Sequence, residues 1–298
     1  MNLLSVLIVN FNGARHLPRL VRALEEQTLP RHRWEVVVVD NASADGSANL
    51  LPSWMRVVRL AKNVGFAEGN NVARRHAHGN YLVLLNNDTV PDPYWLEELE
   101  RVRAANPGAC VASKLVFDAD PHTVNSGGLY LLRDGRGADA GFREPDGGQY
   151  ERERDVFAGC GAAVGMPAGG DVLDGRYFMY YEDLDAGWAA QAHGRRTIFA
   201  PRSLVRHVHG GAAGDQSPLF RFHVERNRAL TNLRRADAFL ALGSMLVLLA
   251  KVPQAWLRVL LRKQPAAQGW AVSHALVSFA LRFPRTLAER YAERSACA

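Results

Sequence analysis

The sequence predicts an α/β fold in which a mostly parallel β-sheet is flanked by helices and followed by a helical extension. Three observations support this prediction. Short β-branched apolar runs alternate with longer segments that have one apolar face. Polar side chains gather directly after those runs, and the last 80 residues change to an Arg- and Leu-rich composition. With 48% apolar and 22% charged residues, the 298-residue chain is not compositionally disordered.

The first hundred residues alternate between strand and helix patterns. Leu17, Leu20, Val21 and Leu24 recur at helical spacing and predict a helix with one buried face. In order, the expected elements are a strand at Val6–Val9, that helix, strands at Glu35–Asp40 and Val57–Leu60, a helix at Phe66–His78, a strand at Tyr81–Leu85 and a helix at Asp92–Arg103. This order is typical of a parallel sheet covered by helices.

The second half has weaker patterns. Between Cys110 and Tyr150 short strand-like pieces precede a loop rich in Gly, Asp and Arg, from Asp134 to Tyr150. Asp183–His193 is compatible with a helix, and Thr197–Ala200 and Leu204–Val208 predict two short strands. We therefore expect one α/β domain over residues 1–218 and a helical extension over residues 219–298.

The net charge of +6 is concentrated at one end of the chain. Residues 1–218 carry 23 basic and 26 acidic side chains, whereas residues 219–298 carry 13 and 4. A mildly acidic body with a basic tail indicates an anionic partner at the tail. Nucleic acid is the less favoured partner, because no recognisable binding module accompanies the charge.

The basic tail also has long apolar stretches. The run from Ala238 to Ala250 has 13 residues, fewer than the 20 or so that a membrane span needs. Beyond it, Trp and Leu alternate with Arg and Lys as far as Phe283, a mixture that suits a helix lying in the lipid headgroup layer. Residues 238–298 are thus expected to bind an anionic membrane surface. The alternative is a basic face packed on the body or on a second subunit.

Polar residues at the ends of the predicted strands form the first candidate site. In open α/β sheets, ligands bind beyond the carboxyl ends of the strands. Asp40 could accept hydrogen bonds from a base or a ribose there, or serve only as a turn or helix cap. Asp88 with nearby amides could hold a hard divalent cation, or form an Asx turn. The residues concerned are Asn10, Asn12, Asp40, Asn41, Asn86, Asn87 and Asp88.

Two later segments carry further candidate groups. Glu182, Asp183 and Asp185 follow an aromatic run, where a carboxylate can act as a general base with a tuned pKa or can simply cap a helix. His207 and His209 end a predicted strand, as structural residues or as ligands. The sequence has no GxxxxGK[ST] or GxSxG motif, which disfavours P-loop NTPases and α/β-hydrolases.

Six segments together resemble the family 2 glycosyltransferases of the GT-A fold, and most closely their bacterial rhamnosyltransferase-like members. The segments are SVLIVNFNG, VVVVDNASADGS, KNVGFAEGNN, YLVLLNNDTVPDPYWLEEL, FMYYEDLDAGW and LVRHVHGG, in that order from residue 5 to about residue 211. The resemblance implies a dTDP- or UDP-linked sugar donor, a divalent ion (Mg²⁺ or Mn²⁺) and inversion at the anomeric carbon.

The resemblance also implies roles for individual residues. Asp183 would be the catalytic base, supported by Glu182. Asp88 and Asn86 stand where the family has its DxD metal motif, here NND, and His207 would complete the metal site with His209 as its substitute. Asp40 would bind the base of the donor. The rest of the nucleotide pocket would be formed by Asn10, Asn12, Asn41, Asn63, Gly65, Asn70, Asn71 and Asn87.

These expectations define one function and two rivals. The expected function is transfer of a sugar, with L-rhamnose as the candidate, to a saccharide or lipid-linked acceptor in cell-surface polysaccharide synthesis, at the cytoplasmic face of the membrane. The loop Asp134–Tyr150 would be an acceptor lid or a surface insertion. The rivals are a nucleotidyltransferase that makes nucleotide sugars, which VNFNG does not favour because it lacks a Gly-rich basic signature, and a non-catalytic sugar- or membrane-binding homologue.

Overall fold

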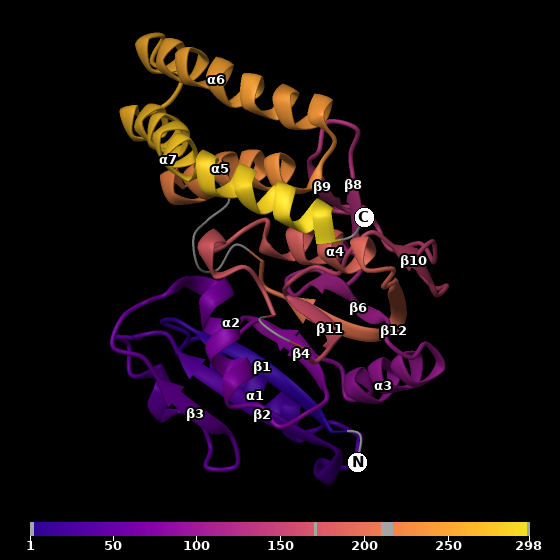
Figure 1. The fold of residues 1–298 in the computed structure, drawn as a ribbon. Coiled ribbons are helices and arrows are strands. Elements are labelled where there is room, and N and C mark those ends of the chain that lie inside the picture. Colours follow the sequence, from indigo (N-terminus) through magenta and orange to yellow (C-terminus); the bar gives the residue numbers. More distant parts are fainter. Residues whose placement is uncertain (1–2, 170–171, 210–216, 297–298) are drawn as a thin grey trace. The chain divides into compact units, whose positions relative to one another are not determined.

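A computed structural model describes residues 3–169, 172–209 and 217–296 (Figure 1). The chain divides into two compact units. The first, here called the sheet unit, comprises Met1–Tyr130, Ala138–Phe178 and Glu182–Gly211. The second, here called the helical unit, comprises Leu131–Gly137, Met179–Tyr181 and Ala212–Ala298. Each unit is described by itself.

The sheet unit is built on a ten-stranded sheet in which eight strands follow the order β10-β12-β6-β11-β4-β1-β2-β3. Of the other two, β5 pairs with β12 and β7 pairs with β6. The strands are β1 (Leu4–Asn10), β2 (Trp34–Asp40), β3 (Arg56–Arg59), β4 (Tyr81–Leu85), β5 (Thr89–Pro91), β6 (Cys110–Phe117), β7 (Val124–Ser126), β10 (Arg154–Val156), β11 (Ala163–Pro167) and β12 (Thr197–His207). A separate hairpin pairs β8 (Leu129–Leu131) with β9 (Gly137–Asp139).

The predicted α/β fold with a helical extension is confirmed. Strands β3, β2, β1 and β4 run parallel, and so do β6 and β12. Strand β11 lies antiparallel between β4 and β6, so the sheet as a whole is mixed. The register of β1 with β2 places Asn10 directly beside Asp40 at the carboxyl ends of both strands.

Helices cover both faces of the sheet, which is why central strands such as β4 have mainly apolar side chains on both faces. Alternate residues of β1 face opposite sides. Val6 and Ile8 belong to the core with α1 and α3, whereas Leu7 belongs to the core with α2. The helices of this unit are α1 (Leu17–Glu25), α2 (Gly65–Arg75), α3 (Trp95–Ala105) and α4 (Glu182–Ala192), with short 3₁₀ turns at Arg31–Arg33, Ser47–Asn49 and Gly175–Tyr177.

Three local expectations differ from the structure. The two strands expected at Thr197–Ala200 and Leu204–Val208 form one strand, β12, with a register shift between Ala200 and Leu204. The helix expected from Asp92 begins at Trp95, because Asp92 instead forms a turn whose carboxylate accepts from the Tyr94 N–H. The predicted loop Asp134–Tyr150 contains strand β9, which pairs with β8.

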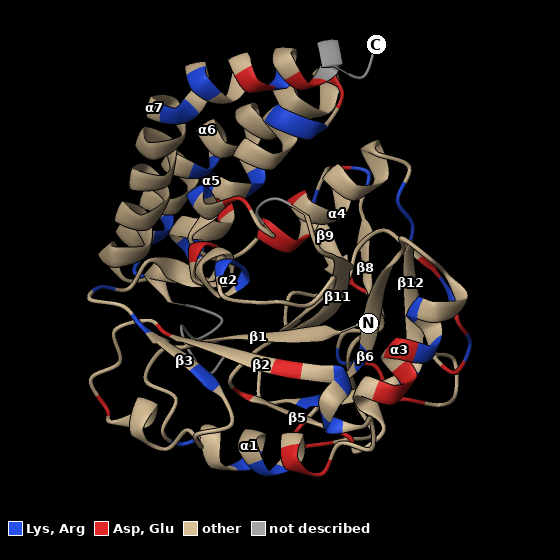
Figure 2. Ribbon diagram, turned by 60° about the horizontal axis from the view of Figure 1, so that its bottom comes forward, with Lys and Arg blue, Asp and Glu red and all other residues tan. Residues whose placement is uncertain are grey.

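The helical unit consists mainly of α5 (Pro218–Arg235), α6 (Ala238–Leu260) and α7 (Ala266–Ala296), which pack on one another. Its core includes Leu230, Leu233, Leu248 and Phe279. Helix α6 carries few charges, whereas α5 and α7 carry both signs (Figure 2). At 23 residues, α6 extends well past the 13-residue apolar run, and by length and composition it could cross a membrane.

Candidate active site

The carboxyl ends of β1 and β2 are tied together by a buried amide. Asn10 is completely buried, and its Nδ2 donates to Asp40 Oδ1 at 3.0 Å and to the Ser47 hydroxyl at 2.8 Å. Its Oδ1 accepts from Asn87 Nδ2 at 3.0 Å. One side chain thus connects the predicted nucleotide-binding carboxylate to the NND motif.

The loop after β2 is closed by Asn12, which is exposed and has a φ of 50°. Asparagine tolerates this left-handed conformation better than most residues. Its Oδ1 accepts from the Ala44 N–H at 2.9 Å, and its own N–H donates to the Ser43 hydroxyl. Asn12 therefore ties the segment after β1 to the loop after β2.

Asn41 fixes the segment that leads into α2. Its Nδ2 donates to Asn63 Oδ1 and to the Gly65 carbonyl, and its Oδ1 accepts from the Val64 N–H. Gly65 has a φ of +88°, and a Cβ there would lie 2.6 Å from the Phe178 carbonyl oxygen. That carbonyl accepts from the N–H groups of Phe66 and Ala67 at the start of α2. Glycine is required here by both conformation and space.

The two asparagines of α2 differ in their surroundings. Asn71 is saturated: it donates to the Leu173 carbonyl and accepts from the N–H groups of Val172 and Leu173. Asn70 donates to the Phe66 carbonyl, but its Oδ1 is buried without a partner. Asn71 holds the chain at residues 172–173, and Asn70 retains an acceptor for a ligand.

The NND motif and the end of β12 form the candidate metal centre. Asp88 and His207 are both buried, and Asp88 Oδ1 lies 3.3 Å from His207 Nε2. Burial would raise the pKa of Asp88, but the hydrogen bond and charge of His207 outweigh it together with the charge of His16, so the pKa is lowered. Asp88 is thus held in the ionised form that a cation needs.

The donors fit a divalent ion in a shared site. Asn86 Oδ1, two residues from Asp88, is buried without a hydrogen-bond partner, so an oxygen acceptor is available there. Within the described ranges, no group of three or more His, Cys, Asp or Glu side chains could hold a metal. An ion at Asp88 and His207 would therefore need further ligands from amides, water or substrate phosphates, as Mg²⁺ commonly does.

His209 is placed differently from His207. Its φ is 54°, and its ring packs against Phe117 and Phe142, with centroids 5.6 and 5.3 Å away. Its Nδ1 lies 3.2 Å from Nδ2 of Asn125, whose Oδ1 is 2.8 Å from His207 Nδ1. His207 thus contacts Asp88 directly, whereas His209 is connected to His207 by way of Asn125.

The acid pair begins α4. Asp183 Oδ2 accepts from the Gly161 N–H at 3.0 Å and its Oδ1 accepts from the Leu184 N–H at 2.8 Å, which fixes the plane of the carboxylate. Burial raises the pKa of Asp183 despite these hydrogen bonds. Burial and the neighbouring Asp183 together raise the pKa of Glu182 well above its usual value. Glu182 Oε2 is buried without a partner.

A third carboxylate, Asp139 on β9, was not anticipated from the sequence. Burial raises its pKa to about 6, the hydrogen bond from Ser126 opposes this shift, and Asp139 interacts electrostatically with both Asp183 and His207. Its Oδ1 is buried without a partner. Asp139 therefore lies within electrostatic range of both the acid pair and the metal centre. Its only sequence signal was its place in the Gly-, Asp- and Arg-rich loop.

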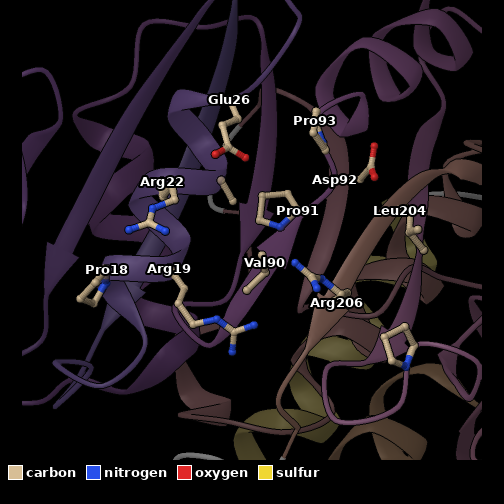
Figure 3. Close-up of a pocket in the computed structure, with 12 residues that line it drawn as sticks. Pro18, Arg19, Arg22, Glu26, Val90, Pro91, Asp92, Pro93, Leu204 and Arg206 are labelled. Carbon is tan, nitrogen blue, oxygen red and sulfur yellow. The ribbon is translucent and has the colours of Figure 1, made fainter.

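A surface cleft of about 500 Å³ lies elsewhere, between α1, β5 and β12. Arg19, Arg22 and Arg206 lie on its walls (Figure 3). None of the predicted site residues lines it. Arg206 is exposed while its neighbour His207 is buried, because adjacent strand residues face opposite ways. The cleft and the candidate active site are therefore on opposite sides of β12.

Relatives of this chain are found among curated sequences. The O-antigen biosynthesis protein RfbC of Myxococcus xanthus is 28% identical over 231 residues, which cover 71% of this chain and 18% of RfbC. The putative teichuronic acid biosynthesis glycosyltransferase TuaG of Bacillus subtilis is 30% identical over 105 residues, or 33% of this chain and 40% of TuaG. The chain thus spans less than half of either relative.

Solved structures share the fold at low sequence identity. GalNAc-T7 with UDP, GalNAc and Mn²⁺ aligns with a TM-score of 0.60 at 16% identity, covering 80% of this chain and 49% of that one. The mannosyltransferase PcManGT from Pyrobaculum calidifontis, in complex with GDP-Man and Mn²⁺, aligns with a TM-score of 0.53 at 17% identity, covering 94% and 86%.

The family model described as glycosyl transferase family 2 matches residues 5–146. This segment contains β1 to β4, the Asn10–Asp40 pair and the NND motif. The acid pair and His207 follow it in the same sheet unit. Residues 5–146 are therefore similar to the family 2 glycosyltransferases, and this matched segment forms most of the sheet unit.

Proposed function

We propose that this protein is an inverting, metal-dependent glycosyltransferase that moves a sugar from a nucleotide-diphosphate donor to a saccharide or lipid-linked acceptor. The observation that supports the proposal most is a continuous run of contacts. Asp40 is joined to Asn10, Asn10 to Asn87 of the NND motif, and Asp88 to His207. A separate acid pair, with Glu182 buried and Asp183 partly buried, stands at the start of α4.

The nucleotide end of the donor would bind at Asp40. Its Oδ1 already accepts from Asn10, so Asn10 orients the carboxylate toward a base or ribose donor. Asn70 Oδ1 on α2 offers a further buried acceptor. Asn12, Asn41, Asn63 and Gly65 would act mainly by fixing the loops around this pocket, a role that their hydrogen bonds support.

Asp88 and His207 would hold Mg²⁺ or Mn²⁺, with Asn86 as a further oxygen donor. A bound divalent ion supplies Lewis-acid stabilisation of the charge on the leaving diphosphate. The chain's own contribution is to keep Asp88 ionised, since His207 lowers its pKa. GalNAc-T7 and PcManGT, which share this fold, were crystallised with Mn²⁺.

Asp183 would be the general base. The acceptor oxygen forms a bond to the anomeric carbon while the bond from that carbon to the phosphate oxygen breaks, and the hydroxyl proton passes to a carboxylate oxygen of Asp183. Hydrogen bonds from Gly161 and Leu184 orient this carboxylate. A raised pKa makes Asp183 a stronger base once ionised. Glu182 would assist or contact the acceptor.

The donor and acceptor classes follow from resemblance and from the relatives. The rhamnosyltransferase-like motifs favour dTDP-L-rhamnose, with UDP sugars as the alternative. RfbC and TuaG carry names in O-antigen and teichuronic acid biosynthesis, which supports a cell-surface polysaccharide as the product.

A screen of nucleotide sugars tests this proposal. With Mn²⁺ present, one dTDP or UDP sugar is expected to raise the melting temperature and to be slowly hydrolysed, and EDTA is expected to abolish hydrolysis. Asp88→Asn should lose most of the Mn²⁺-dependent rate, while Asp155→Asn, an exposed carboxylate paired with Arg196, should keep it. Full hydrolysis in EDTA would contradict the metal site.

The helical unit would dock on an anionic membrane surface. Around the turn between α6 and α7, the apolar side chains Leu257, Leu260, Leu261 and Trp270 are all more than half exposed. Basic residues at 258, 262 and 263 are exposed among them. Only 22% of the most apolar window of α6 is buried. Exposed apolar side chains beside basic side chains suit the lipid headgroup layer of an anionic membrane.

Vesicle sedimentation tests the membrane role. Replacing Arg258, Arg262 and Lys263 by Gln should weaken binding to vesicles with anionic lipid by roughly 10²-fold, at about 1 kcal/mol per basic residue. The matched control replaces three exposed basic residues of the sheet unit, Arg56, Arg59 and Lys62, and should bind as the parent does. Equal binding by both triple variants would refute this docking surface.

A further inference from the structure

Asn125 lies on β7 between the two histidines and is 3% exposed. Its Oδ1 is 2.8 Å from His207 Nδ1, and its Nδ2 is 3.2 Å from His209 Nδ1. On the other side of the His207 ring, Nε2 lies 3.3 Å from Asp88 Oδ1. Asn125, His207 and Asp88 therefore form a line of contacts that ends at the candidate metal centre.

The chemistry of the amide fixes the direction of these hydrogen bonds. A carbonyl oxygen only accepts, so His207 Nδ1 must carry a proton. The amide nitrogen only donates, so His209 Nδ1 must present its lone pair. When the His207 ring is protonated, its Nε2–H donates to Asp88. When the ring is neutral and keeps its proton on Nδ1, Nε2 carries the lone pair that a cation beside Asp88 can take. His209 has its Nδ1 occupied by Asn125 and its ring packed between Phe117 and Phe142.

We propose that Asn125 is a positioning residue that makes His207, and not His209, the metal ligand. It does so by holding the proton of His207 on Nδ1, which leaves Nε2 free to bind a cation beside Asp88. The inference rests on the metal site of the proposed function and assigns a residue outside the motifs that define it. Metal-binding histidines are commonly fixed in this way by an acceptor on their second nitrogen.

Binding of Mn²⁺ alone, measured by calorimetry without donor or acceptor, tests the positioning role. Asn125→Leu removes the acceptor and should weaken Mn²⁺ binding 10- to 100-fold, the range typical for such partners. Asn125→Asp keeps an oxygen acceptor for His207 and should stay within about threefold of the parent. His209→Asn keeps a residue that tolerates positive φ and should also stay within about threefold. Asn106→Ala, which removes an amide at the end of α3, is the structural control.

The tautomer of His207 gives a second readout that needs no metal. In the metal-free parent, ¹⁵N NMR should show that the neutral imidazole ring of His207 carries its proton on Nδ1. In Asn125→Leu the neutral ring should shift to the Nε2–H form, because Asp88 is then the remaining acceptor. An exposed histidine such as His78 reports any general change.

The outcomes separate this inference from the proposed function. If Asn125→Leu binds Mn²⁺ as tightly as the parent, or if the His207 tautomer is unchanged, the positioning role is wrong. If His209→Asn loses Mn²⁺ binding and His207→Ala keeps it, the ligand assignment is wrong. If neither Asp88→Asn nor His207→Ala affects Mn²⁺ binding, the metal site itself fails, and the tautomer measurement still decides whether Asn125 controls His207.

Discussion

Two carboxylate sites in the sheet unit have pKa values that are shifted in opposite directions. Asp88 and Glu182 are both less than a tenth exposed. Burial by itself would raise the pKa of each. Yet the pKa of Asp88 is lowered, because His207 donates to it and carries the opposite charge, while the pKa of Glu182 is raised well above its usual value by burial and by the neighbouring Asp183. Among equally buried carboxyl groups, the neighbouring side chain thus decides whether the pKa shift caused by burial is reversed.

This difference suits two distinct chemical tasks. A carboxylate that stays ionised beside an imidazole offers a permanent site for a cation. A pair of carboxyl groups with raised pKa values holds a proton more readily and is a stronger base when ionised. Asp139 interacts with members of both groups and titrates at about 6, between the two extremes. The following predictions test this contrast, beginning with the largest effect.

Asp183→Asn should lower transferase turnover by roughly 10²- to 10⁴-fold, the usual contribution of a general base. The amide can still accept a hydrogen bond from Gly161 but cannot take the acceptor proton. Donor binding, followed by thermal stabilisation with the nucleotide sugar, should be nearly unchanged. A variant with full turnover would remove Asp183 from the role of base.

Asp139→Asn should flatten the pH dependence of stability between about pH 4 and 6. The folded pKa of Asp139 is raised to about 6 from 3.8, so its favourable contribution is complete below pH 4 and is lost as the pH rises through 6. A shift of this size corresponds to roughly 3 kcal/mol. Denaturant unfolding at pH 4 and pH 7 measures the effect, and parallel curves for parent and variant would show that Asp139 is not perturbed.

The local pattern of the sequence was enough to locate most strands and both acid motifs. Uniformly apolar runs such as Tyr81–Leu85 are buried on both faces, so they can be predicted as strands without knowing which strands they pair with. Strand β12 was divided in the prediction because Pro201 and Arg202 interrupt its apolar pattern, and the structure accommodates them at a register shift.

Groups that act through distant contacts could not be located in this way. Asn125 lies 82 residues from His207 in the chain, and nothing in its own segment indicates that β7 pairs with β6 beside β12. Asp139 is surrounded by Gly and Ala in a segment with no apolar period. Their positions depend on the pairing of strands far apart in sequence. The sequence could therefore nominate residues for a base and a metal site but not the residues that tune them.

Glu182→Gln should change stability and gives the sharpest view of the contrast between the two sites. Because the folded pKa of Glu182 is raised, its protonated form is favoured in the fold, and stability falls as the pH rises from the unfolded value toward the folded one. The amide carries no charge at any pH. The variant should therefore gain melting temperature relative to the parent by a few degrees at pH 8, with little gain at pH 4. The corresponding substitution at the metal centre is Asp88→Asn. Because the folded pKa of Asp88 is lowered, its carboxylate stabilises the fold at pH values above the unfolded-state pKa. The variant should therefore lose stability at pH 8 and lose less at low pH. Shifts of the same sign for both variants at pH 8 would show that burial, and not the neighbouring side chain, controls these two sites.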